Sequence, residues 1–134
     1  MRYSLYSRST RGLTLIELSV TIAVILILAG IVTISVKPFV AYRDGTAAGE
    51  MLRSVKAAQL MYLADNPATP INALTQANLL PYMPQGNWPT LPSVNGQTPT
   101  INFNKFPPVA ELNPGSTYDP SGSPTDGLWD VGQY

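Results

Sequence analysis

Apolar residues dominate the first part of the chain. Residues 13–36 form a nearly uninterrupted apolar run that contains one charge, Glu17. A helix of this length spans about 36 Å, enough to cross a bilayer, whereas a strand of this length lies far outside the usual range. The run therefore predicts a membrane-spanning helix. Its N-terminal side faces the cytoplasm by the positive-inside rule, because three arginines precede it, namely Arg2, Arg8 and Arg11.

The next segment mixes apolar and charged residues at helical spacing. Between residues 39 and 64 apolar positions recur three and four apart, with charged positions between them. This pattern predicts an amphipathic helix over residues 39–64, continuous with the membrane helix through a kink at Pro38. The Asn66-Pro67 step ends it. The apolar stripe of this helix needs a partner layer, which the remaining residues must supply.

A short second helix is predicted over residues 71–80. Thr69 is a candidate N-cap, Pro70 suits the first helical position, and Pro81 marks the end.

Short strands are predicted beyond Pro81, where proline and glycine are frequent. The candidates are residues 91–94, 100–103 and 127–131, and Asn95-Gly96 predicts a tight hairpin turn. The fold class is therefore α+β: a long N-terminal helix packed on a small antiparallel sheet, with a loop-rich C-terminus. Four aromatic residues are expected to close the core against the long helix: Trp88, Phe103, Phe106 and Trp129.

Composition removes several kinds of chemistry. The 134 residues include neither cysteine nor histidine, which excludes disulfides, thiol catalysis, thiolate zinc sites and imidazole acid–base chemistry. The net charge is zero, but the chain from residue 13 onward contains five basic and eight acidic residues, which gives this part a net charge of −3. A mildly acidic distal half argues against nucleic-acid binding. Since no catalytic motif is evident either, we expect a protein that is not an enzyme.

Glu17 lies at the start of the apolar run, where a carboxylate is costly. The cost is roughly 2.5–3.5 kcal/mol near the bilayer centre and less near its edge. The surrounding segment, Arg11-Gly12-Leu13-Thr14-Leu15-Ile16-Glu17-Leu18, resembles the processing site of type IV prepilins and pseudopilins. The resemblance implies that prepilin peptidase cleaves between Gly12 and Leu13 and that Leu13 is then N-methylated.

The same resemblance implies a domain organisation and a set of partners. Residues 1–12 would be a cleaved basic leader, residues 13–36 a transmembrane and filament-core helix, and residues 37–134 an amphipathic helix plus a small periplasmic pilin-like domain. Glu17 would pair with the terminal amine of a neighbouring subunit in a helical homo-oligomeric filament. The partners would be prepilin peptidase/methyltransferase, other pseudopilins and an inner-membrane assembly platform. The protein would reside in the bacterial inner membrane and then in a periplasmic or cell-surface filament.

Within that family the chain is most similar to the major, G-like pseudopilin of type II secretion. It is short, and it has a Tyr118-Asp119-Pro120 loop near its C-terminus. An Asp-Pro-Trp-Gly segment, which would strengthen this assignment, is missing.

The C-terminal loop is rich in oxygen ligands. Calcium binds six to eight oxygens, and the resemblance implies a possible calcium site made by Asp119, Asp126 and Asp130. No cofactor is otherwise required. The alternative is that Asp and Ser residues stabilise turns through bonds to their own backbone.

Alternative functions remain open on the same residues. A true or minor type IV pilin, acting in adhesion, motility or DNA uptake, would have the same N-terminal motif. A signal-anchored domain of another function would have the same apolar helix, as would a membrane-anchored enzyme based on paired carboxylates or Ser/Lys chemistry.

Overall fold

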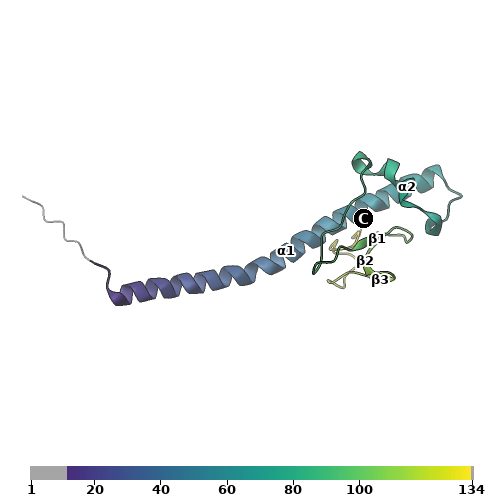
Figure 1. Ribbon diagram of the computed structural model, residues 1–134. Coiled ribbons are helices and arrows are strands. Elements are labelled where there is room, and N and C mark those ends of the chain that lie inside the picture. Colours follow the sequence, from purple (N-terminus) through teal and green to yellow (C-terminus); the bar gives the residue numbers. More distant parts are fainter. Residues whose placement is uncertain (1–11, 134) are drawn as a thin grey trace, which may run out of the picture. The chain divides into compact units, whose positions relative to one another are not determined.

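The predicted long helix is present as α1, Leu15–Asp65, in the computed structural model, which describes residues 12–133 (Figure 1). It runs without interruption through Pro38, so the apolar run and the amphipathic segment belong to one helix. The chain divides into two compact units, the first ending at Lys37 and the second beginning at Pro38. The predicted leader, apart from Gly12, lies outside the described residues.

In its described part, the first unit contains the beginning of α1. This stretch is long and apolar enough to cross a membrane, and none of it is buried within the protein. The large apolar side chains described between residues 15 and 32 are therefore exposed.

The second unit places one face of α1 against a small antiparallel sheet. The buried residues of the helix recur three and four apart, at Ala48, Leu52, Val55 and Ala58, as the predicted amphipathic pattern requires. The sheet has the order β1-β2-β3, where β1 is Thr100–Asn102, β2 is Val109–Asn113 and β3 is Ser116–Thr117. The predicted α+β class is confirmed.

Strand pairing brings apolar residues of the sheet into the core. Ile101 of β1 lies opposite Ala110 of β2, and both are buried. Between β2 and β3 the register shifts after Glu111, which pairs with Thr117. The short strands thus form a compact layer that covers one side of the helix.

Two buried polar side chains tie this layer together. Gln59 of α1 is fully buried, and its Nε2 donates to the carbonyl oxygens of Phe103 (2.7 Å) and Lys105 (3.0 Å). Glu111 accepts hydrogen bonds from Asn102 Nδ2 at 2.9 Å and from the Gly115 amide at 3.1 Å. Its carboxylate also lies 3.1 Å from Lys105 Nζ. The Asn102 bond is the main cause that lowers the pKa of Glu111.

Three of the four predicted aromatic residues contact the core. Trp88 packs edge-to-face on Phe103 with ring centroids 5.3 Å apart, and Trp129 packs in the same way on Tyr118 at 4.9 Å. The prediction for Phe106 is wrong. Its ring is half exposed and lies 5.9 Å from Lys56 Nζ.

The predicted second helix over residues 71–80 is wrong, because the segment is broken. It consists of the 3₁₀ turn η1 (Ile71–Ala73), the short helix α2 (Gln76–Leu79) and the 3₁₀ turn η2 (Leu80–Tyr82), followed by η3 (Pro84–Gly86). Thr75, rather than Thr69, is the N-cap of α2, and it forms a capping box with Asn78. A strong cap inside the segment starts a new helix there and interrupts the earlier one.

The strand predictions had mixed outcomes. The Asn95-Gly96 turn is confirmed by two hydrogen bonds between Val94 and Gln97, but residues 91–94 contribute only that isolated bridge rather than a strand. The strand over 100–103 is confirmed as β1, although its partner β2 was not predicted. Residues 127–131 form turns instead of a strand, because Gly127 and Trp129 have positive φ angles of 75° and 63°.

Candidate functional site

The predicted cleavage bond lies in the chain that precedes α1. Gly12 and Leu13 are both outside the helix and exposed, and Leu13 has 70% of its surface accessible. Proteases act most readily on exposed chain that is not held in helical hydrogen bonds. The Gly12–Leu13 bond is thus accessible, and a Cβ added to Gly12 would meet nothing within 4 Å.

Thr14 forms the beginning of the helix. Its Oγ1 accepts a hydrogen bond from the Glu17 amide at 3.3 Å, and its carbonyl oxygen accepts from the Leu18 amide at 3.1 Å. Thr14 is therefore the N-cap of α1 and Glu17 occupies the third helical position. Sequence reasoning singled out Glu17 and missed Thr14, although Thr-x-x-Glu ahead of an apolar run is the spacing of a capping box.

Glu17 is exposed in the first turn of α1. The helix dipole favours a carboxylate there by about 0.3–1 kcal/mol. That contribution is smaller than the cost of holding the charge well inside a bilayer. Glu17 therefore needs water, a lipid headgroup or a cation beside it.

The apolar surface of the first unit is available for lipid or for other helices. Its large apolar side chains between residues 15 and 32 are about half exposed or more: Leu15, Ile16, Leu18, Val20, Ile22, Val24, Ile25, Leu26, Ile27, Leu28, Ile31 and Val32. The hydroxyls of Ser19 and Thr21 donate to carbonyl oxygens of their own helix at 2.8 Å each. These polar groups are satisfied locally, so they do not oppose burial of the helix in an apolar phase.

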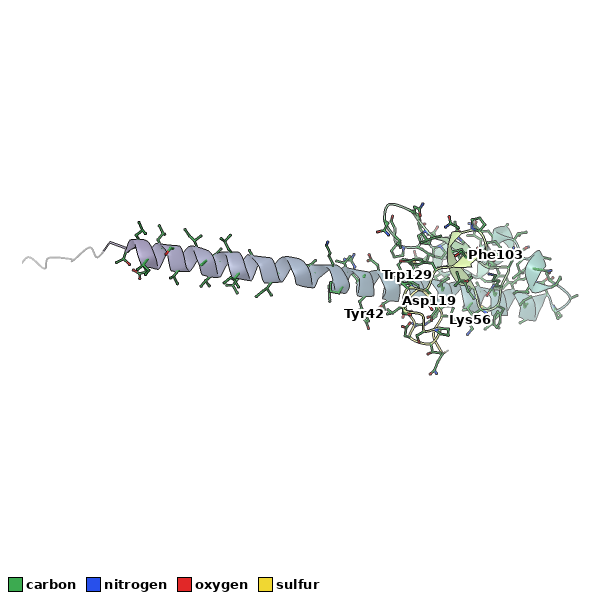
Figure 2. All side chains as sticks on the ribbon, turned by 90° about the horizontal axis from the view of Figure 1, so that it is seen from below. Tyr42, Lys56, Phe103, Asp119 and Trp129 are labelled. Carbon is green, nitrogen blue, oxygen red and sulfur yellow. The ribbon has the colours of Figure 1, made fainter. Side chains whose placement is uncertain are left out.

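Two glycines of α1 receive the C-terminal loop. The Trp129 amide donates to the Gly45 carbonyl oxygen at 3.0 Å, and Trp129 lies against the helix there (Figure 2). A Cβ on Gly49 would overlap the carbonyl oxygen of Gly127 and approach that of Asp130 within 2.9 Å. The glycines therefore allow the backbones of loop and helix to approach closely.

Arg53 extends this contact by one helical turn. Its Nε donates to the carbonyl oxygen of Val131 at 3.1 Å, while its Nη1 pairs with Glu50 at 2.5 Å. Positions 45, 49 and 53 follow each other at four-residue spacing and so share one face of the helix. The regular spacing of Gly45 and Gly49 was the signal in the sequence for a close approach.

The three predicted calcium ligands each have one oxygen committed to a turn. Asp119 Oδ1 accepts from the Ser121 and Gly122 amides at 3.2 Å each. Asp126 Oδ1 accepts from the Leu128 amide at 2.9 Å, and Asp130 Oδ1 accepts from the Gly132 amide. Within residues 12–133 no three acidic side chains are grouped so that they could hold a metal ion.

The charges of this loop nevertheless interact. The hydrogen bond from the Leu128 amide lowers the pKa of Asp126. Burial raises the pKa of Asp130, and the nearby charges of Asp126 and Asp119 raise it further. Asp130 Oδ2 is buried and has no hydrogen-bond partner among residues 12–133. A cation would satisfy that oxygen. The Oδ1 atoms of Asp119, Asp126 and Asp130, however, already accept hydrogen bonds within turns. The calcium site therefore stays a prediction.

Comparison with known families agrees with the geometry at the N-terminus. Residues 7–33 match the family model of the prokaryotic N-terminal methylation motif. Searches of curated proteins and of solved structures gave no match. The match includes Gly12, Leu13 and Glu17, and it supports a type IV pilin-like protein that is processed by prepilin peptidase. An exposed apolar helix near the N-terminus is consistent with a membrane anchor.

Proposed function

We propose that this chain is a pseudopilin, a structural and non-enzymatic subunit of the filament of type II secretion. Prepilin peptidase cleaves it between Gly12 and Leu13, Leu13 is N-methylated, and the mature subunit assembles through α1. The observation that carries the proposal is the methylation-motif match over residues 7–33, combined with an exposed Gly12–Leu13 bond directly ahead of a capped helix.

Glu17 supplies the electrostatic contact for assembly. Cleavage creates a cationic amine at Leu13, and the amine of one subunit lies beside the Glu17 carboxylate of the next. Two opposite charges 4 Å apart attract by about 4 kcal/mol at an effective dielectric constant near 20, and by about 1 kcal/mol in water. The pair is therefore worth most when both groups are already away from water, as they are in the core of a filament.

The second unit suits the outer surface of such a filament. Its apolar core is closed by the chain itself, and its C-terminal loop is held on α1 through Gly45, Gly49 and Arg53. These contacts tie down the C-terminal loop in a chain without cysteine. In the membrane this unit would be periplasmic, and the N-terminus cytoplasmic.

The test compares Glu17→Ala and Glu17→Gln with wild type in cells that supply prepilin peptidase and a type II secretion assembly platform. We expect all three chains to be cleaved, but both variants to yield fewer sheared filaments by about tenfold, the effect of losing roughly 1.4 kcal/mol per subunit contact. Glu50→Gln is the matched control, since Glu50 is an exposed carboxylate of the second unit.

Two results would contradict the proposal. Normal filament yield from Glu17→Ala would remove the pairing role of the carboxylate. Assembly on a type IV pilus platform but not on a secretion platform would instead identify a true or minor pilin.

A further inference from the structure

Exposed aromatic side chains mark the beginning of the second unit. Phe39 has 70% of its surface exposed, Tyr42 63% and Val40 36%. Phe39 and Tyr42 are called the aromatic patch. Figure 2 shows that Tyr42 projects from α1 on the N-terminal side of the folded domain. Burial within the second unit begins only at Gly45.

Aromatic residues are unevenly distributed along the first half of α1. Residues 13–36 contain no aromatic residue, and Phe39 and Tyr42 are the first ones after that run. They are three residues apart and so lie on one face of the helix. Aromatic residues concentrated just past the end of a membrane-length apolar run, and missing within it, follow the distribution found at membrane–water interfaces.

The charges beside the patch are Lys37, which precedes it, and the Arg43–Asp44 ion pair, which follows it. Arg43 Nη2 lies 2.9 Å from Asp44 Oδ1, and most of the Arg43 side chain is exposed. This pair has no net charge, so Lys37 leaves one positive charge beside the aromatic surface. A ring with an apolar body and, for tyrosine, a hydroxyl tip is suited to the boundary between acyl chains and headgroups.

We propose that the aromatic patch lies at the headgroup level of the membrane, in the leaflet on the side of the folded domain, and fixes the depth of α1 before assembly. The inference rests on the proposed function, in which the subunit first resides in the membrane. The occupant of the patch is the lipid interface, because the patch follows directly on the exposed apolar run that α1 would place in the bilayer.

This depth has a consequence for Glu17. From Phe39 back to Glu17 the helix has a contour length of about 33 Å, close to the roughly 30 Å thickness of the hydrocarbon core. With Phe39 at one boundary, this length of helix is enough for Glu17 to reach the other boundary, where a carboxylate costs less than at the bilayer centre. The patch thus keeps the assembly carboxylate near water until a neighbouring amine replaces that contact.

The test uses the full chain in vesicles of phosphatidylcholine and phosphatidylglycerol. Since the protein contains no cysteine, an Ala41→Cys substitution allows one fluorophore to be attached beside the patch. Its quenching is measured with nitroxide lipids labelled at the headgroup or deep in the acyl chain, and with aqueous iodide. The Phe39→Ser/Tyr42→Ser double variant removes the patch. Leu60→Ser/Met61→Ser is the matched control, because Leu60 and Met61 are 51% and 53% exposed on the same helix.

We expect the fluorophore to be quenched most by the headgroup nitroxide. The patch variant should lower that quenching about twofold and raise iodide quenching, and the control should change neither. Strong iodide quenching in the wild-type background, or equal effects of the patch and control variants, would overturn the proposal. Protection that appears only at high protein-to-lipid ratio, without quenching by lipid nitroxide, would also overturn it and indicate a second copy as the occupant.

Cleavage after Gly12 by added prepilin peptidase is measured in the same vesicles. Cleavage combined with an iodide-exposed fluorophore would refute the aromatic patch and leave the proposed function standing. A headgroup-level fluorophore in a chain that is never cleaved would refute the proposed function and, with it, the assembly role given to the patch.

Discussion

A methyl group added at Gly49 tests how the C-terminal loop is held on α1. In the folded chain the new Cβ would overlap the carbonyl oxygen of Gly127 and lie 2.9 Å from that of Asp130. Both obstacles are backbone atoms, so no side-chain rotation relieves the clash. The loop must move away from the helix, or the helix must bend.

Opposing contributions set the magnitude of the effect. Alanine is favoured over glycine in a helix by about 1 kcal/mol, which acts against destabilisation. Overpacking costs about 1–3 kcal/mol, and detaching Trp129, which is buried, approaches the 3–5 kcal/mol of a tryptophan-to-alanine change. The hydrogen bond from Arg53 to Val131 adds about 1 kcal/mol. We therefore expect Gly49→Ala to lower the free energy of unfolding by about 2–4 kcal/mol.

The assay is thermal unfolding of the full chain in detergent, followed by tryptophan fluorescence and near-UV circular dichroism. For a domain of this size the expected loss lowers Tm by roughly 10–20 °C. Gly45→Ala should have a smaller effect, because its Cβ would meet side-chain atoms of Trp129 and Leu128 at 3.1–3.3 Å. Gly30→Ala is the control, since its Cβ would meet nothing within 4 Å. A Gly49→Ala chain as stable as wild type would refute the close approach.

Other substitutions probe the buried polar groups. Glu111→Gln should cost about 1–2 kcal/mol at neutral pH by weakening the bonds to the carboxylate. Because the folded-state pKa of Glu111 is lowered, chiefly by Asn102, its contribution is present above the unfolded pKa near 4.3 and is lost as pH falls through the folded pKa. The variant should therefore show a flatter fall of Tm with acid, and an unchanged acid limb would contradict this. Asp130→Asn should raise Tm at neutral pH in EGTA, because burial and the charge of Asp126 raise the pKa of Asp130, so its ionised form opposes folding once pH exceeds the unfolded value. A lower Tm, together with a rise of the wild-type Tm on adding calcium, would favour the calcium site instead. Gln59→Met should lower the urea midpoint by the equivalent of about 1–3 kcal/mol, because the carbonyl groups of Phe103 and Lys105 lose their donor. A shift below about 1 kcal/mol would show that water replaces the amide.

The sequence was most informative where structure depends on neighbouring residues. α1 follows from a long apolar run joined to a period near 3.6, and the Asn95-Gly96 turn follows from two residues that tolerate positive φ. The helix over residues 71–80 failed because Thr75 and Asn78 form a competing cap inside it. That signal was also local, but Thr69 and Pro70 fit the N-cap and the first helical position so well that the helix was predicted to begin there.

Contacts between distant residues were not predictable from pattern. Residues 127–131 were predicted to form a strand, yet Trp129 is buried because it docks on Gly45, more than eighty positions earlier in the chain. The candidate processing site is the opposite case. Gly12, Leu13 and Glu17 lie within one short segment, so the order of residues along the chain is enough to indicate their chemistry. Thr14 was missed there because the charge of Glu17 is a more conspicuous signal than a hydroxyl at the N-cap.

The central claim is that Gly12–Leu13 is a prepilin-peptidase site, and intact-mass spectrometry of the chain tests it most directly. The protein is expressed with and without an active peptidase and extracted from membranes. We predict a mature form that begins at Leu13 and carries one added methyl group on its amine, present only when the enzyme is active. A chain that keeps residues 1–12 beside an enzyme that processes a known substrate would contradict the account.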